Sequence, residues 1–202
     1  MKIMLVRHGQ SVWNAERRLQ GQADIELSAL GREQAKKLAG TVQALQPDRV
    51  VASDLKRTRQ TANLLGFGDH DTARALREID VGIWTGQRIS DLIDADADAY
   101  RGWRAGTSTP PDGESWAAFK QRTSDAVLAI GRTSVERVLL VAHGAVIRAL
   151  LESFLNLRPE RIVPVSPASL TVLQYGQEVG DTRVRLEVFN YAVGGPVFDA
   201  PD

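Results

Sequence analysis

Residues 3–9, IMLVRHG, carry the pattern on which the fold class depends. Four apolar residues are followed directly by an arginine, a histidine and a glycine. A short run that is apolar on both faces is typical of a buried strand in a parallel sheet. Residues 138–144, VLLVAHG, repeat this arrangement, and residues 50–57, VVASDLKR, lead from a third apolar run into basic residues. We therefore expect three core strands, each ending in polar residues.

Helical patterns separate these strands along the chain. Apolar residues recur at helical spacing over residues 28–46, with Ser28 as the expected N-cap, and helices are also predicted over residues 55–65, 114–133 and 145–155. Two further strands, residues 170–175 and 184–189, are predicted around a turn near Gly180 and Asp181. This alternation predicts a three-layer α/β/α sandwich with a mostly parallel central sheet.

The middle of the chain, residues 66–112, is less regular. A short helix is predicted over residues 88–95, and the polar stretch 94–112 is interpreted as an excursion from the core. One hypothesis is a cap around residues 80–112 that covers a site; the alternative is a surface loop without a role. The whole chain, residues 1–202, is expected to form one domain, because this length supports a single substantial core.

The composition argues against several classes of protein. The 25 lysines and arginines balance 25 aspartates and glutamates, so the net charge gives no reason to expect a nucleic-acid or membrane partner. The chain has no cysteine, which excludes disulfides and thiolate catalysis and agrees with the expected cytoplasmic location. No apolar run approaches the roughly 20 residues that a membrane helix needs, and the N-terminus does not resemble a signal peptide.

The positions of two histidines indicate the chemistry. In open α/β sheets, ligands bind at the carboxyl ends of the strands, where His8, His143 and the basic residues after the third strand are expected to meet. Arginine matches phosphate oxygens with two parallel hydrogen bonds, and a neutral histidine can act as a nucleophile. Because nearby arginines disfavour the imidazolium form, they would keep His8 neutral. The pattern favours phosphoryl chemistry.

A metal site is the rival interpretation. The sequence lacks the His-x-His and His-Glu-x-x-His patterns of common metal sites, and Arg7 beside His8 would repel a cation. We therefore do not expect a bound metal.

Beyond this pattern, the sequence resembles the histidine phosphatase superfamily, the group that includes the cofactor-dependent phosphoglycerate mutases. The R-H-G triplet alone is a weak signal, but the full set of motifs appears in the family's order and is highly specific. The motifs are LVRHGQS (5–11), WN (13–14), QG (20–21), LS to GR and QA (27–35), SDLKRT (53–58), TA (61–62), LRE (76–78), GIWTG (82–86), GES (113–115) and VAHG (141–144). The resemblance implies a phosphoglycerate mutase-like fold.

The resemblance also implies a role for each matching residue. His8 resembles the nucleophile that becomes phosphohistidine, and Glu78 resembles the acid that protonates the leaving oxygen and then activates water. The two clamping arginines are matched by Arg7 and Arg57, with Arg59 as the alternative if the register slips. The remaining matches are His143, which binds the transferring phosphoryl group in the family's catalytic set, Asn14 as a supporting phosphate ligand, Gln20 and Gly21 as pocket residues, and Gly144 through its backbone N–H.

The implied function is a phosphatase that hydrolyses phosphate monoesters of small metabolites without a cofactor. Residues 78–86, EIDVGIWTG, differ from the mutase-like pattern Glu-Arg-His-Tyr-Gly, and the longer insert of the mutases is missing. The alternatives are a cofactor-dependent phosphoglycerate mutase, a phosphoprotein phosphatase and a non-catalytic phosphate-binding module. The last is disfavoured because every residue that the mechanism needs is present. The expected partner is a small phosphorylated metabolite, and the expected state is a monomer or a homodimer.

Overall fold

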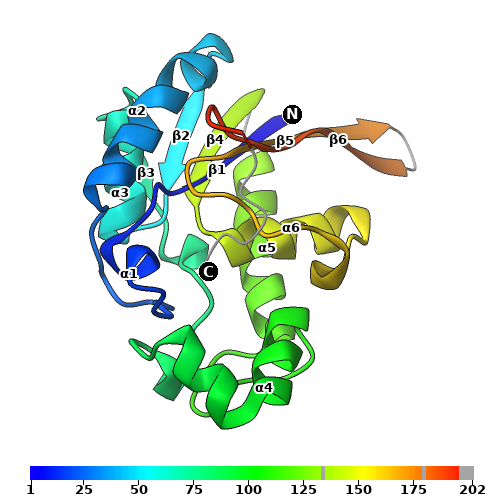
Figure 1. Cartoon of the computed structure of the whole chain (residues 1–202). Coiled ribbons are helices and arrows are strands. Elements are labelled where there is room, and N and C mark those ends of the chain that lie inside the picture. The colour runs from blue at the N-terminus through cyan, green and yellow to red at the C-terminus, as the bar shows by residue number, and fades with distance from the viewer. Residues whose placement is uncertain (133–134, 179–180, 196–202) are drawn as a thin grey trace.

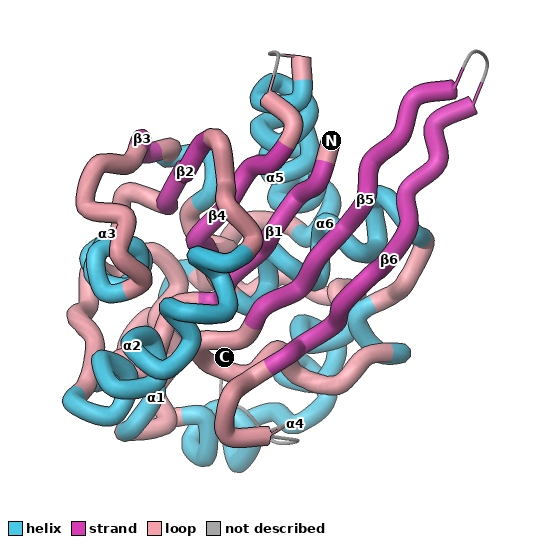
Figure 2. The backbone as a smooth tube through the Cα atoms, turned by 90° about the horizontal axis from the view of Figure 1, so that it is seen from above, coloured by secondary structure: helices cyan, strands magenta, loops and turns pink. Residues whose placement is uncertain are grey.

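A computed structural model describes residues 1–132, 135–178 and 181–195 of the chain. Its centre is a six-stranded sheet, whose strands lie side by side in Figure 2 in the order β3-β2-β4-β1-β5-β6. The pairings that join β3, β2, β4 and β1 are parallel, and those of β5 and β6 are antiparallel, which confirms a mostly parallel sheet. The strands are β1 (Lys2–Arg7), β2 (Arg49–Ala52), β3 (Asp71–Thr72), β4 (Arg137–Ala142), β5 (Leu170–Glu178) and β6 (Asp181–Tyr191).

Helices cover both faces of this sheet (Figure 1). Because successive side chains of a strand point to opposite faces, β1 contributes to two cores: Met4 and Val6 pack with α2 and α3, whereas Ile3 and Leu5 pack with α5 and α6. This arrangement confirms the predicted three-layer sandwich. The covering helices are α2 (Ala29–Ala44), α3 (Lys56–Leu64), α5 (Trp116–Gly131) and α6 (Gly144–Leu155).

Serine side chains begin three of the helices. Ser28 caps α2 as predicted, because its side chain accepts a hydrogen bond from the backbone N–H of Gly31 at 3.1 Å. Ser115 caps α5 in the same way. The one-turn helix α1 (Val12–Ala15) was not predicted, and it begins with a capping box between Ser11 and Asn14. Of these caps, the one at Ser11 lies three residues after His8.

The segment after residue 88 differs from its prediction. The short helix expected over residues 88–95 continues as α4 (Ile89–Ala105), so the first half of the stretch taken as an irregular excursion is helical. The helix is kinked at Asp96, whose φ and ψ of −159° and 90° are not helical. The alternating Asp-Ala sequence around the kink has no apolar residues at helical spacing, so the sequence gives no helix signal there. The second half of α4 is packed onto the core by Trp103, a contact that only the tertiary structure shows. Figure 1 shows α4 beyond the end of the sheet toward which the arrow of β2 points.

The remaining elements are short or lie at the edge. The two-residue strand β3 pairs in parallel with β2 and was not predicted. The hairpin of β5 and β6 confirms the two predicted terminal strands, although Gly180 in its expected turn lies outside the described residues. Three 3-10 turns, η1 (Arg74–Leu76), η2 (Gly82–Trp84) and η3 (Pro159–Arg161), complete the element order. Within the described part of the chain, every helix is too short or too polar to cross a membrane.

Candidate active site

The parallel pairing of β1 and β4 places two histidines next to each other. The register aligns Arg7 with Ala142, so that His8 and His143 follow at corresponding positions, and the backbone N–H of His8 donates to the carbonyl of Ala142 at 3.0 Å. Both side chains are buried, and their ring centroids are 5.2 Å apart. The structure thus brings the two histidines together, as the strand-end pattern predicted.

The hydrogen bonding of His8 defines which ring nitrogen can react. Its Nδ1 lies 2.7 Å from the carbonyl oxygen of Gly9. A carbonyl oxygen can only accept, so the neutral ring carries its proton on Nδ1 and keeps its lone pair on Nε2. Burial lowers the pKa of His8 well below its ordinary value, and the charges of Arg57 and Arg7 lower it further. His8 is therefore a neutral base near neutral pH, with Nε2 as the available nucleophilic atom.

His143 is neutral for the same reasons. Burial lowers its pKa well below the ordinary value, and the charge of Arg57 adds to this effect. Both ring nitrogens of His143 lack a hydrogen-bond partner among the described residues. Since buried polar groups are nearly always hydrogen-bonded, this ring is ready to donate to a bound ligand.

Two buried arginines lie beside the histidines. Arg57, on α3, donates to the carbonyl oxygens of Ala23 at 2.7 Å and Gly21 at 2.8 Å. Arg7, at the end of β1, donates to the carbonyl of Val165. Burial lowers the pKa of each arginine to about 10, so both remain positively charged at neutral pH. Their positions are fixed by backbone acceptors, which leaves their charge available to an anion.

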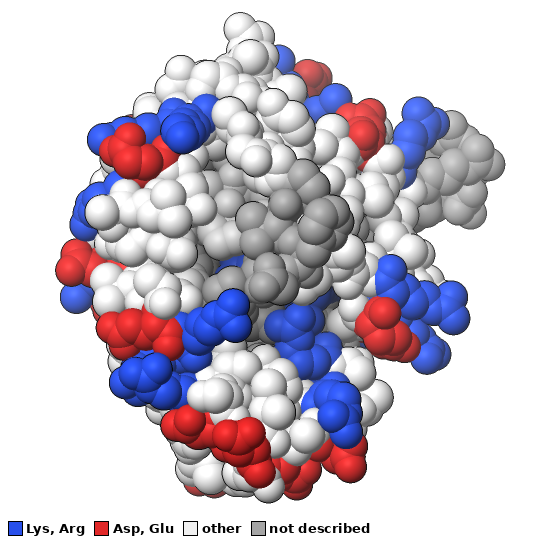
Figure 3. All heavy atoms as spheres, viewed as in Figure 1, with Lys and Arg blue, Asp and Glu red and all other residues white. Residues whose placement is uncertain are grey.

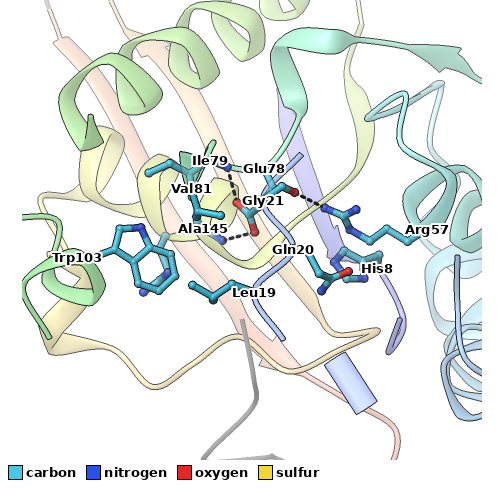
Figure 4. Close-up of a pocket in the computed structure, with 11 residues that line it drawn as sticks. His8, Leu19, Gln20, Gly21, Arg57, Glu78, Ile79, Val81, Trp103 and Ala145 are labelled. Atoms are coloured by element: carbon cyan, nitrogen blue, oxygen red, sulfur yellow. Dashed lines mark hydrogen bonds between the residues drawn. The ribbon is translucent and has the colours of Figure 1, made fainter. Parts of the chain in front are cut away.

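The carboxylate of Glu78 faces the same space (Figure 4). Its Oε1 accepts from the backbone N–H of Ile79 at 3.0 Å, and its Oε2 accepts from the backbone N–H of Ala145 at 3.3 Å. Ala145 lies in the first turn of α6, where the partial positive charge of a helix N-terminus favours a carboxylate. The side chain of Glu78 is thereby oriented from two sides.

These groups border a pocket. In Figure 4, His8 and Arg57 lie on one side of it and Trp103 on the opposite side, with the Glu78 carboxylate between them. Gln20 and Gly21 line the pocket, and their role in binding substrate stays a prediction. The complete lining is His8, Leu19, Gln20, Gly21, Arg57, Glu78, Ile79, Val81, Trp103, Ala145 and Arg148.

The other predicted residues lie next to this lining. Asn14 is buried, and its Oδ1 accepts from the backbone N–H and the hydroxyl of Ser11, each at 3.1 Å. The same hydroxyl is 2.6 Å from Oε1 of Gln20, so Asn14 is linked to the pocket through Ser11. Gly144 begins α6, and a Cβ atom there would lie 3.5 Å from Cζ of Arg7. The roles assigned to these residues remain predictions.

Six lining residues were not predicted as site residues: Leu19, Ile79, Val81, Trp103, Ala145 and Arg148. Arg148 is only 5% exposed on α6 and donates to the backbone carbonyl of Arg104 at 3.3 Å. Burial lowers its pKa to about 9. A single arginine inside the apolar run 145–151 is a usable signal, because a buried charge needs compensation. Trp103 was missed because its segment was not predicted to be helical.

Charge is unevenly distributed around the site. On the face shown in Figure 3, lysine and arginine side chains gather between α4 and the rest of the molecule, while acidic side chains lie on the outer side of α4. A local positive field of this kind attracts anions even when the net charge is zero, as it is here.

Comparison with known proteins identifies the family. The sequence profile described as the histidine phosphatase superfamily (branch 1) matches residues 3–187. A relative from Enterobacter sp. (strain 638), named probable phosphoglycerate mutase GpmB, is 34% identical over 187 residues, which are 87% of this chain and 85% of the relative.

Solved structures agree with this result. A mycobacterial glucosyl-3-phosphoglycerate phosphatase in complex with VO3 has a TM-score of 0.85 and 35% identity, covering 94% of this chain and 98% of that one. A protein called mycobacterial hydrolase 1 has a TM-score of 0.87 and 32% identity, covering 95% and 99%. With the profile matching nearly the whole chain, and with paired histidines at the carboxyl ends of β1 and β4, the chain belongs to the histidine phosphatase superfamily.

Proposed function

We propose that the chain is a phosphatase that hydrolyses phosphate monoesters of small metabolites through a phosphohistidine at His8. The observation that carries the proposal is the 2.7 Å contact of Nδ1 of buried His8 with the carbonyl oxygen of Gly9, which implies a neutral ring with its lone pair on Nε2. Two fixed arginines beside it are suited to balance the charge on the phosphoryl oxygens in the transition state. Phosphoryl transfer depends mostly on such positioning and charge stabilisation.

The reaction consists of two in-line displacements. In the first, Nε2 of His8 bonds to phosphorus while the P–O ester bond breaks, and Glu78 gives a proton to the leaving oxygen. In the second, Glu78 takes a proton from water, the water oxygen bonds to phosphorus, and the P–Nε2 bond breaks to release phosphate. Arg7, Arg57 and the N–H of His143 bind the phosphoryl oxygens in both steps.

The pocket supports a small organic substrate. Apolar Leu19, Val81 and Trp103 share its wall with the amide of Gln20. Such a wall fits a compact molecule with both apolar and polar surface. The structural neighbour that acts on glucosyl-3-phosphoglycerate supports the same substrate class.

The name of the curated relatives favours a second candidate, a phosphoglycerate mutase. A mutase returns the phosphoryl group to a second hydroxyl of its substrate, whereas a phosphatase transfers it to water. Incubation with 3-phosphoglycerate separates the two: interconversion with 2-phosphoglycerate without release of phosphate would establish the mutase and overturn the proposal.

The direct test is phosphate release from p-nitrophenyl phosphate in excess EDTA by the wild type and by His8→Ala. We expect turnover by the wild type and a fall of roughly 10⁴-fold or more in the variant, because the nucleophile is missing. Quenching in alkali during wild-type turnover should trap a phosphoenzyme that is stable in alkali and loses its phosphate in acid. Activity that survives in His8→Ala, or that requires added metal, would contradict the mechanism.

A further inference from the structure

Glu78 differs from the other groups of the site in what holds it. His8 and His143 follow β1 and β4, and Arg57 lies on α3, whereas Glu78 lies between the 3-10 turns η1 and η2, outside every helix and strand. A group that transfers a proton must stay within hydrogen-bond distance of the reacting oxygen. Contacts from elsewhere must therefore hold this segment in place.

One arginine from α5 contacts the backbone on the N-terminal side of Glu78. Nη1 of Arg122 donates to the carbonyl oxygens of Ala75 at 2.8 Å and Arg77 at 3.1 Å. The rest of the same guanidinium binds the carboxylate of Glu114, with Nε to Oε1 at 2.9 Å and Nη2 to Oε2 at 2.7 Å. This geometry uses the planar fork of arginine, which lysine does not provide.

Glu114 contacts the backbone on the other side of Glu78. Its N–H donates to the carbonyl oxygen of Asp80 at 2.9 Å, and its Oε2 lies 3.4 Å from the backbone N–H of Asp80. The ion pair of Glu114 and Arg122 therefore binds the chain two residues after Glu78 and one and three residues before it. Its side chains are 18% and 26% exposed, so water only partly weakens the pair.

We propose that the Glu114–Arg122 pair positions the carboxylate of Glu78 for proton transfer. The pair touches the backbone on both sides of Glu78, and neither of its residues is part of the pocket lining. It acts through the segment 75–80, whose placement sets the two hydrogen bonds of the carboxylate, to Ile79 and Ala145. The inference rests on the proposed function, in which Glu78 is the acid. It also gives a role to Glu114, whose GES motif had none in the sequence analysis.

The leaving group provides the test, because an alcohol that is a poor leaving group needs the acid and p-nitrophenolate scarcely does. We would measure kcat/KM for p-nitrophenyl phosphate and for a set of alkyl phosphates with wild type, Glu114→Gln and Glu78→Gln. For Glu78→Gln we expect losses of roughly 10²–10³-fold on alkyl phosphates and about tenfold or less on p-nitrophenyl phosphate. Glu114→Gln should show the same selectivity with a smaller loss on alkyl phosphates, about 10- to 100-fold.

Two further variants complete the design. Glu152→Gln is the matched control, because Glu152 pairs with Lys120 of the same helix α5 at 2.8 Å and similar exposure but does not contact the segment 75–80. Any change in kcat/KM that this variant causes should be the same for alkyl phosphates and for p-nitrophenyl phosphate. Arg122→Lys keeps a charge opposite Glu114 and so protects folding, but it cannot bind Glu114 and both carbonyls at once; it should show the same leaving-group selectivity as Glu114→Gln.

The outcomes separate the inference from the proposed function. Equal losses on alkyl and p-nitrophenyl phosphates in folded Glu114→Gln and Arg122→Lys, with selectivity kept in Glu78→Gln, would overturn the positioning role alone. If Glu78→Gln itself shows no selectivity while His8→Ala is inactive, the assignment of Glu78 as the acid fails instead. Circular dichroism of each variant establishes that it is folded.

Discussion

His8 and His143 follow two paired strands, whereas Glu78 lies on a segment between two 3-10 turns. Side chains hold that segment: the Glu114–Arg122 pair, the Asp54–Arg77 pair and Gln22, whose Nε2 donates to the carbonyl oxygen of Glu78 at 3.3 Å. For the histidines, the sheet itself defines the geometry, since the β1–β4 register that aligns Arg7 with Ala142 also brings the next two residues together. For Glu78, the geometry depends on the ion pair of Glu114 and Arg122. The comparison teaches that the nucleophile half of the site is built by backbone hydrogen bonds and the acid half by side chains.

If this comparison holds, the largest effect after that of His8→Ala should come from removing the charge beside His8. Arg57→Met is expected to lower kcat/KM by roughly 10³-fold, because a fixed positive group that stabilises the transition state is lost. The loss should be similar for alkyl and p-nitrophenyl phosphates, unlike the losses expected for the Glu78 segment. Steady-state kinetics on both substrate types measures it.

Arg59→Met is the matched control for this change. Arg59 lies on the same helix but is exposed, so its replacement should leave kcat/KM within about twofold of wild type, as for most surface substitutions. If Arg59→Met is as damaging as Arg57→Met, the assignment of the clamping arginine is wrong.

The second effect concerns the backbone contact that supports the nucleophile half. A Cβ atom at Gly31 would lie 1.9 Å from the carbonyl oxygen of Gln10, two residues after His8. Gly31→Ala must therefore push α2 away from this loop, and we expect it to lower the free energy of unfolding by about 2–3 kcal/mol, as overpacking does. Urea unfolding measures the change.

Gly40 offers the comparison on the same helix. A Cβ atom there meets nothing within 4 Å, and alanine is the better helix former, so Gly40→Ala should stabilise the protein by up to about 1 kcal/mol. If Gly31→Ala and Gly40→Ala change the free energy of unfolding equally, the close approach of α2 to the His8 loop does not contribute to stability.

The third effect is the pH dependence of stability that the histidine pair produces. The pKa values of His8 and His143 are lowered in the folded protein, so the unfolded chain binds more protons below its ordinary histidine pKa. The contribution of the two histidines to the free energy of unfolding should therefore be fully present above about pH 6.5. It should decrease as the pH falls below this value, by at most about 1.4 kcal/mol per pH unit for each histidine.

Urea unfolding at several pH values between 7 and 5 tests this sign. The acidic groups whose pKa values are lowered, such as Asp54 with Arg77, contribute the same sign only at lower pH. The double variant His8→Asn/His143→Asn should show a flatter pH dependence in this window. An unchanged slope would mean that the paired histidines are not the source.

Much of the fold was predictable because its signals are local. Apolar runs, helical periods and serine caps act between neighbouring residues, and they located the core strands and the covering helices. The kinked helix α4 was not predicted in full, because its Asp-Ala repeat hides the helical period and its second half is identified by the burial of Trp103. The short strand β3 exists only through its pairing with β2.

The candidate site divides in the same way. The sequence by itself determined that His8, His143 and Arg57 follow core strands. They were therefore expected to meet, because residues at the carboxyl ends of parallel strands share one edge of the sheet. Only the tertiary structure decided the proton position of His8, the place of Arg148 in the pocket and the link from Glu114 and Arg122 to the segment of Glu78. These features depend on distances between residues far apart in the chain, which no local pattern encodes.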